Sequence, residues 1–378
     1  MRTLLQVTLA ISLSGSLFAQ FPGLTLPPSG NNQKASVTQF IGPVQITIDY
    51  SSPAIHGPGG TDRRGQIWGK LVPYGMSDLA FNGGKLSPWR GGANENTVFT
   101  VSDPVMVEGQ PLAAGKYGLH FIPDKEEWTV IFSKNASAWG SFFYDETQDA
   151  LRVKVKPVKR EYREWLAYEF TTRRPSEATA ELQWEELGVP WNVKAENVND
   201  IYVSKLRQEL TGGNGFNPEA YDAAAQYCVQ ENTHLEDGLN WAEQAIKMPF
   251  IGTTNFATLS TKSQVLLKMG RDAEAQTIMQ AAVKDPGATA IQIHQYGRQL
   301  LAAKKGQEAL EVFKLNAQRN GDAWPINVGL ARGYMAVGDY PKALEYARKA
   351  AAQAPDNQNK QNLESMVKSL SDGKPYNN

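Results

Sequence analysis

The stretch ALEVFKLNA at residues 309–317 returns as ALEYARKAA at residues 343–351, so the two copies start 34 residues apart. A further copy, AQTIMQAA, starts another 34 residues earlier, at Ala275. Small or apolar residues recur at the first, fifth and eighth positions of these copies. At that spacing they share one face of a helix and let a second helix pack closely. The repeat therefore predicts stacked pairs of helices.

The helical pattern extends over residues 197–370, and an earlier copy, GLNWAEQAI, carries Gly238 at the alanine position. A helix-turn-helix period of 34 residues is the signature of tetratricopeptide repeats, and residues 217–354 resemble them. Such repeats bury a core by stacking and present a concave face. We therefore expect an unknown protein or peptide partner there, the alternative being a bundle that only supports the rest of the chain. Residues 371–378 are predicted to be a disordered tail.

Over residues 35–195 the apolar pattern has a period of two, as in Val44, Ile46 and Ile48, with turn signals between the runs. About nine short strands without long helices between them predict an antiparallel β-sandwich or a barrel-like domain. The expected fold class is thus multidomain β plus α. A later run alternates Ala178, Ala180, Leu182 and Trp184 with Thr179, Glu181 and Gln183. The tryptophans expected in the core are Trp128, Trp165, Trp184 and Trp191.

The start of the chain has the features of a secretory signal peptide. Residues 1–19 contain Arg2, a short apolar run and small residues before Gln20. Residues 20–34 are rich in Pro, Gly and Asn and are expected to form a flexible linker. No later apolar stretch is long enough for a membrane span, and no cysteine marks a lipid attachment point. The sequence predicts an exported protein, periplasmic or secreted, that is not lipid-anchored.

Composition argues against several function classes. A net charge of -1 and a pI near 6.5 disfavour nucleic-acid binding. The basic run RVKVKPVKREYR from Arg152 alternates as a strand with one solvated face. The single cysteine, Cys228, lies in a helical pattern and is interpreted as a buried hydrophobe. Four scattered histidines, without HExxH, CxxC, a P-loop or a GxSxG elbow, predict no metal, no cofactor and no assignable catalytic residue.

Several short sequence motifs in the first half of the chain occur in the same order as in a known family, which they resemble. They include TIDYSSPAIHG (47–57), IWGKLVPYG (67–75), WRGGANENT (89–97), LAAGKYGLHFIP (112–123) and EWTVIFSK (127–134). Together they resemble the domain of unknown function numbered twenty-nine eleven, found in exported bacterial proteins. That family has no assigned activity, so the resemblance implies fold and location only. Two segments look expanded relative to the family, near residues 57–66 and 76–88, and they either cover or open the loop between them.

That loop, SPWRGGANENT at residues 87–97, holds the candidate ligand-binding residues. Arg90 offers a planar fork of donors suited to a carboxylate or a phosphate. Trp89 offers a flat apolar face, and Asn94 and Glu95 add polar groups. These are the ingredients of a pocket for a small ligand.

A structural interpretation uses the same residues. Gly91 and Gly92 would form a turn, Trp89 would fill the core, and Arg90 would pair with an acid such as Asp145 or Asp149.

Two further residues complete the candidate site. His120, in GKYGLHFIP, is a possible general base on a strand, or else an ordinary hydrogen-bonded histidine. Tyr74 lies in a loop, where an exposed ring suggests binding.

Three functions remain open from the sequence. The first is a non-catalytic exported module whose β-domain recognises a ligand or partner and whose repeats bind protein. The second is an envelope hydrolase with Glu95 or His120 as acid or base. The third is a structural component, for which we expect no pocket and an internally paired Arg90.

Overall fold

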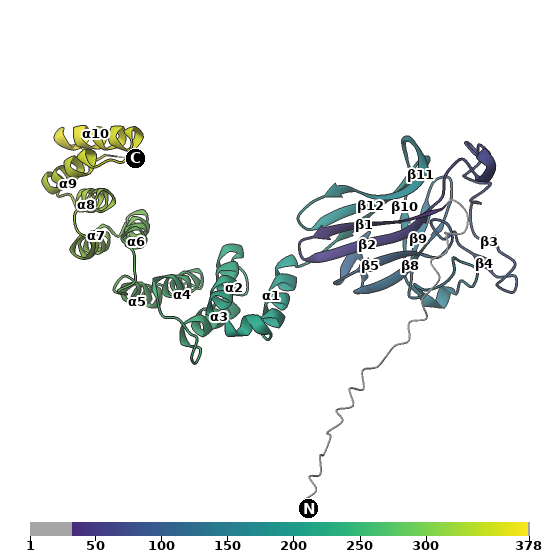
Figure 1. Cartoon of the computed structure of the whole chain (residues 1–378), viewed down its shortest axis with the longest axis horizontal. Helices are drawn as coiled ribbons and strands as arrows, with labels where there is room; N and C mark the ends of the chain where they lie inside the picture. Colours follow the sequence, from purple (N-terminus) through teal and green to yellow (C-terminus); the bar gives the residue numbers. More distant parts are fainter. Residues whose placement is uncertain (1–31, 377–378) are drawn as a thin grey trace, which may run out of the picture. The chain divides into compact units, whose positions relative to one another are not determined.

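The computed structural model describes residues 32–376, so the predicted signal peptide and most of the predicted linker lie outside the described residues. Gln33 and Lys34, assigned to the linker from sequence, belong instead to the first strand. The chain divides after Val198 into two compact units, a β-domain and a helical unit (Figure 1).

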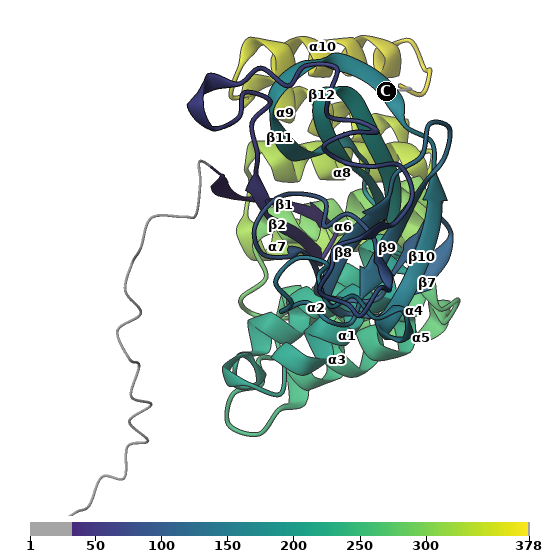
Figure 2. The ribbon, with the colours of Figure 1, turned by 90° about the vertical axis from the view of Figure 1, so that its right-hand side faces the viewer.

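The β-domain is an antiparallel sandwich. A six-stranded sheet in the order β1-β2-β5-β8-β9-β10 faces a four-stranded sheet in the order β11-β12-β6-β7, and β3 and β4 form a separate hairpin. Figure 2 shows β8, β9 and β10 side by side. The strands are β1 (Gln33–Ile41), β2 (Val44–Ser52), β3 (Ser77–Asp78), β4 (Leu86–Ser87), β5 (Thr97–Val101), β6 (Val105–Val107), β7 (Gln110–Leu112), β8 (Gly115–Ile122), β9 (Trp128–Ser133), β10 (Asp149–Val155), β11 (Val158–Arg173) and β12 (Glu177–Lys194).

Aromatic rings from the two sheets meet in the core. Phe121 of β8 contacts Trp191 of β12, with ring centroids 6.0 Å apart, and Tyr50 of β2 contacts Tyr168 of β11 at 4.9 Å. Val44, Ile46 and Ile48 point inward and are fully buried, as their alternation predicts. The predicted sandwich is confirmed.

The central strands depart from simple alternation. All six residues of β9 are buried, because residues 134–148 return over the outer face of this sheet. Trp165 of β11 is 44% exposed, so its predicted place in the core is wrong. Leu166, Tyr168 and Phe170 are the buried residues of this part of β11, so alternation places Trp165 on the opposite, outward face with Ala167 and Glu169.

Glu181 of β12 alternates with the core residues Ala180 and Leu182 but is itself fully buried. Its carboxylate accepts two hydrogen bonds from Arg160 of β11, at 2.6 and 2.9 Å. Gly188 makes room for it, since a Cβ there would collide with Glu181 Oε1. The buried charge is tolerated because it is paired on both oxygens.

The helical unit consists of helix pairs. Each short turn returns the chain alongside the preceding helix, as Figure 1 shows for α8, α9 and α10. The helices are α1 (Val198–Glu209), α2 (Pro218–Glu231), α3 (Leu235–Lys247), α4 (Phe256–Lys268), α5 (Asp272–Ala282), α6 (Ala290–Ala302), α7 (Gly306–Asn320), α8 (Trp324–Ala336), α9 (Tyr340–Ala352) and α10 (Asn357–Ser371).

The period seen in the sequence is the period of the helices. The first helices of three pairs, α4, α6 and α8, begin at residues 256, 290 and 324, each 34 residues after the last. Ala275, Ala309 and Ala343 are fully buried in the second helices. Gly238 occupies the same position in α3, where an added Cβ would lie 2.8 Å from the Cβ of Cys228. The predicted repeat array is confirmed.

The helical unit also shows the outcome of the predictions made for Cys228 and for the C-terminal tail. Burial raises the pKa of the Cys228 thiol to about 11, as expected of a packed side chain rather than a reactive one. The predicted disordered tail is wrong for residues 371–376, because Ser371 ends α10 and Tyr376 N donates to Met335 Sδ of α8. Among the described residues, no helix is long and apolar enough to cross a membrane.

The β-domain encloses its own aromatic core, so we expect residues 32–197 to fold alone. A fragment with these ends should unfold in one cooperative thermal transition, followed by tryptophan fluorescence and near-ultraviolet circular dichroism. A fragment that showed no cooperative transition would contradict the division after Val198.

Candidate functional site

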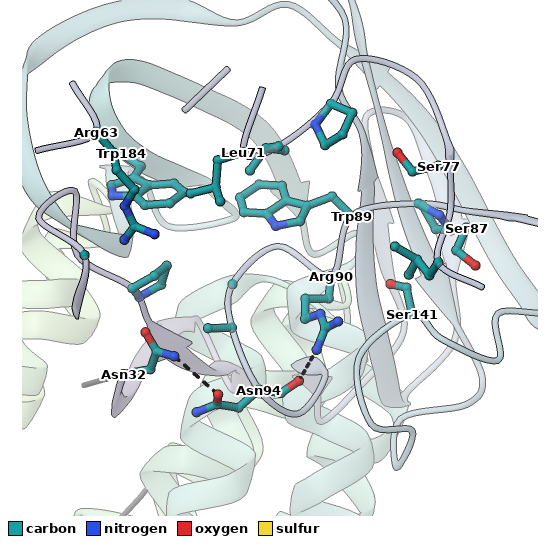
Figure 3. Close-up of a pocket in the computed structure, with 18 of the residues that line it drawn as sticks. Asn32, Arg63, Leu71, Ser77, Ser87, Trp89, Arg90, Asn94, Ser141 and Trp184 are labelled. Atoms are coloured by element: carbon teal, nitrogen blue, oxygen red, sulfur yellow. Dashed lines mark hydrogen bonds between the residues drawn. The ribbon is translucent and has the colours of Figure 1, made fainter. Parts of the chain in front are cut away.

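The β-domain contains a cavity of about 650 Å³ beside the WRGGANENT loop (Figure 3). Its walls come from parts of segments 53–57, 71–79 (without Tyr74) and 87–94, together with Asn32, Arg63, Ser141 and Trp184. Both predicted insertions contribute, through Gly57 and Arg63 in one and Ser77, Ser87 and their neighbours in the other. The insertions therefore form walls of the cavity.

The turn after Trp89 is fixed by its backbone. Trp89 N donates to Phe121 O at 2.8 Å, and Phe121 N donates to Trp89 O at 2.7 Å. Gly91 has φ +64°, and a Cβ there would lie 2.5 Å from the Phe121 ring. Tyr168 OH donates to Gly91 O at 2.6 Å. The glycine is required by the turn, as the structural interpretation expects.

Trp89 belongs both to the core and to the cavity wall. Its ring lies 5.8 Å from Trp68 and 6.3 Å from Trp128, and it stacks 6.4 Å from Trp184 at an interplanar angle of 13°. It remains half-buried and lines the cavity together with Trp184 and Leu71. Trp89 can therefore fill the core and face a ligand at once, because it packs against the other tryptophans and also lines the cavity.

Arg90 lines the cavity without a carboxylate partner. Its Nη1 donates to Asn94 O at 2.6 Å, and its guanidinium lies 4.7 Å above the Phe142 ring. Gly140 leaves the room for it, since a Cβ there would collide with Arg90 Cζ. Burial lowers the pKa of Arg90. Within residues 32–376, no ion pair to Arg90 is found, and its Nε and Nη2 donate no hydrogen bond.

The acids proposed from sequence as partners of Arg90 are engaged elsewhere. Asp149 accepts hydrogen bonds from Arg152 Nε and Tyr144 OH, both at 2.6 Å. Asp145 caps a short 3₁₀ helix by accepting from Thr147 N and Oγ1. The expected pairing of Arg90 with Asp145 or Asp149 is therefore wrong.

Three hydroxyl or imidazole groups lie near the guanidinium. Ser141 lines the cavity, and its Oγ lies 2.8 Å from His120 Nδ1. Ser87 also lines the cavity, and its buried Oγ has no hydrogen-bond partner. Burial, followed by the charge of Arg90, lowers the pKa of His120 to about 4. His120 is therefore neutral at neutral pH and lies behind Ser141 rather than in the cavity wall.

The remaining predicted site residues separate into two groups. Asn94 lines the cavity, where its Oδ1 accepts from Asn32 at 3.3 Å, as the dashed lines in Figure 3 show. Glu95 lies outside the cavity lining, paired with Lys34 at 3.1 Å, and hydrogen bonding and this cation lower its pKa. Tyr74 also lies outside it, with its exposed ring against Gly69.

Sequence reasoning missed Arg63, Ser87, Ser141 and Trp184 as lining residues. Arg63 and Ser87 lie in the two segments that look expanded relative to the family, and their place beside the loop could have identified them. Ser141 and Trp184 come from distant segments, and no local pattern connects them to the loop. The described residues contain no group of three or more His, Cys, Asp or Glu side chains that could hold a metal ion.

Comparison with known proteins covers the two units separately. Residues 32–193 match a family described as "Protein of unknown function (DUF2911)", which confirms the resemblance predicted from the sequence words. No match is found among curated proteins.

Several solved structures resemble part of the chain. YrrB, titled "a TPR protein with an unusual peptide-binding site", is 20% identical with a TM-score of 0.32, over 44% of this chain and 84% of its own. PilF of Pseudomonas aeruginosa is 18% identical with a TM-score of 0.32, over 46% of this chain and 84% of its own. A thermophilic TPR protein of Thermus thermophilus is 18% identical with a TM-score of 0.30, over 46% of this chain and 90% of its own.

The burial of neutral His120 predicts a pH dependence of stability. Its folded pKa of about 4 lies below the unfolded value of 6.5, so the unfolded chain binds more protons between these values. Stability should therefore fall as pH falls from about 6.5 to 4, by at most about 3 kcal/mol from this group. Urea unfolding of residues 32–197 at pH 7 and pH 4.5 measures the fall.

The matched variant is His120→Gln in the same fragment. Its loss of stability between the two pH values should be smaller than that of the unsubstituted fragment. An equal loss in both proteins would show that His120 is protonated freely in the folded state.

Proposed function

We propose that the protein is a non-catalytic binding protein. In this proposal the β-domain holds a small anionic ligand in its cavity, and the helical repeats contact a protein partner. The observation that carries the proposal is Arg90, a partly desolvated guanidinium that lines the cavity and has no carboxylate partner in the described chain. A buried cation without a counter-charge is costly, and an anionic ligand would supply that charge.

The cavity lining has an excess of cationic groups. Arg63 also lines it, and this residue donates only to backbone oxygens, those of Ile55 and Ala54. Asp78 is the acid that lines the cavity, and it is exposed and accepts from Ala80 N. A ligand with one carboxylate or phosphate would therefore meet a favourable potential.

The lining also indicates the shape of the ligand. The volume of about 650 Å³ is within the range of small-molecule sites. Hydroxyls of Ser87 and Ser141 lie on the side of Arg90, whereas Leu71 and Trp184 lie on the other side of Trp89 (Figure 3). This distribution favours a ligand with an anionic group at one end and a flat apolar part at the other.

The hydrolase alternative has one supporting observation, the contact between His120 Nδ1 and Ser141 Oγ. A histidine beside Arg90 and nearly excluded from water holds a proton poorly, as its pKa of about 4 indicates. Glu95, the other proposed acid or base, is paired with Lys34 outside the cavity lining. Binding is therefore the function that the geometry supports better. The third alternative, a structural component, expected no pocket and a paired Arg90, whereas Arg90 lines a cavity and contacts a backbone carbonyl rather than a carboxylate.

The proposal includes the compartment. The charged start, short apolar run and small residues of residues 1–19 support export to the periplasm or the medium without a lipid anchor. The concave face expected of stacked helix pairs supports a protein or peptide partner on the helical unit.

Thermal-shift measurements with paired probes test the β-domain site. We expect phenyl phosphate or benzoate, but not the neutral benzamide, to raise the melting temperature. A probe at about 100 times its dissociation constant adds about 2.7 kcal/mol to stability. Arg90→Ala should weaken the binding of the anionic probe by about 2 kcal/mol, which is the typical contribution of a charged hydrogen-bonding group.

The control variant is Arg174→Ala, which removes an exposed arginine that is paired with Glu177 outside the cavity. It should bind the probe like the unsubstituted protein. Equal stabilisation by benzoate and benzamide, or binding that survives Arg90→Ala, would refute the anionic site.

A further inference from the structure

The first helices of two adjacent repeat pairs, α6 and α8, lack acidic residues. α6 (AIQIHQYGRQLLA) and α8 (WPINVGLARGYMA) contain no aspartate or glutamate. Their second helices, α7 and α9, contain acids that pair with lysines on the same helix, as in Lys314–Glu311 and Lys349–Glu345. Acidic groups are therefore absent from the first helices of these two repeats.

Two arginines occupy equivalent positions on these two helices. Arg298 of α6 and Arg332 of α8 lie 34 residues apart, on helices that pack against each other. Within residues 32–376 neither forms an ion pair or a hydrogen bond. Burial lowers the pKa of Arg332, and the charge of Arg298 lowers it further. No aspartate or glutamate of the described chain is among the groups that act on the pKa of Arg332.

His294 and Ile291 lie on the same face of α6 as Arg298. The two residues precede Arg298 by one and two helical turns, so all three share one face. His294 is largely buried, and its Nδ1 has no hydrogen-bond partner. Burial, followed by the charges of Arg332 and Arg298, lowers the pKa of His294 to about 4. Ile291 is 62% exposed. The four residues Ile291, His294, Arg298 and Arg332 are called the α6–α8 face below.

We propose that the α6–α8 face binds an acidic segment of a partner protein that also carries apolar side chains. The carboxylates of the segment would pair with Arg298 and Arg332, and an apolar side chain would cover Ile291. This inference rests on the proposed function of the helical unit and adds the chemistry of the partner.

Charge complementarity is the argument for this occupant. Two guanidiniums with free donors on adjacent helices match carboxylates on one extended chain, and no acid in the described part of the chain neutralises them. Nucleic acid is a poorer match, because only a few cations gather here and the second helices expose acids close by.

The test uses the full chain and three labelled probes in fluorescence anisotropy: a short Glu- and Leu-rich peptide, the same peptide with Gln for Glu, and a single-stranded oligonucleotide. We expect the Glu peptide to bind at least about tenfold more tightly than the other two, and less tightly as salt rises. The double variant Arg298→Gln/Arg332→Gln should lose at least about tenfold in affinity for the Glu peptide.

The control is Lys314→Gln/Lys349→Gln, which removes the same charge from α7 and α9 and should bind the Glu peptide normally. The Arg double variant should melt no lower than the unsubstituted protein, because it removes a desolvated cation that has no partner in the described chain. A melting temperature that fell together with binding would mean that the arginines are structural, and would overturn the proposal.

The remaining outcomes separate this inference from the proposed function. Tighter binding of the Gln peptide would overturn the acidic partner but leave peptide binding by the repeats intact. Tighter binding of the oligonucleotide would replace a protein partner by a nucleic acid. If neither peptide binds, the inference fails together with the protein-contact role of the helical unit, whereas the β-domain site is still judged by Arg90→Ala.

Discussion

The close approach of Gly91 to both sheets is the constraint on which the candidate site depends. Its carbonyl accepts from Tyr168 of the four-stranded sheet, while Trp89, two residues earlier, pairs through its backbone with Phe121 of the six-stranded sheet. No side chain fits at residue 91, because the Phe121 ring and the Tyr168 hydroxyl occupy the position of a Cβ. Arg90 lies between these two anchors. The flexible Arg90 side chain is therefore attached to a fixed backbone, which would reduce the entropy lost on binding the proposed anion.

The insertion at residues 76–88 adds a second support for the same guanidinium. Phe81 packs against Phe142 with ring centroids 5.1 Å apart, and Phe142 lies beneath Arg90. Asn82 Nδ2 donates to Tyr144 O at 2.8 Å and holds the insertion to the segment that carries Ser141. The insertion therefore does more than bound the cavity, since it orders the ring on which the cation rests.

The parts of the structure that local patterns determine were predictable from sequence. The alanine frame of the helices and the alternation of β2 each reflect contacts repeated at a fixed spacing, and both are confirmed. Trp165 was misplaced because its large apolar ring was taken as a core residue, although it alternates with the buried Leu166 and Tyr168 and therefore lies on the outward face of β11. Within the loop, Trp89, Arg90 and Asn94 were found because they are neighbours in sequence, but Ser141 and Trp184 reach the cavity only through the fold.

Arg90 and Arg332 present the same energetic problem in two separate units. Burial lowers the pKa of each, and no ion pair to either is found in the described part of the chain. Arg160, by contrast, compensates the fully buried Glu181 with two hydrogen bonds, as a structural charge requires. Glu181 thus has a charged partner within the chain, whereas Arg90 and Arg332 have no carboxylate partner in the described residues. Stability alone favours replacing a desolvated, unpaired guanidinium by an apolar side chain, and this is the common reason for proposing an anionic ligand at Arg90 and an acidic segment at Arg332.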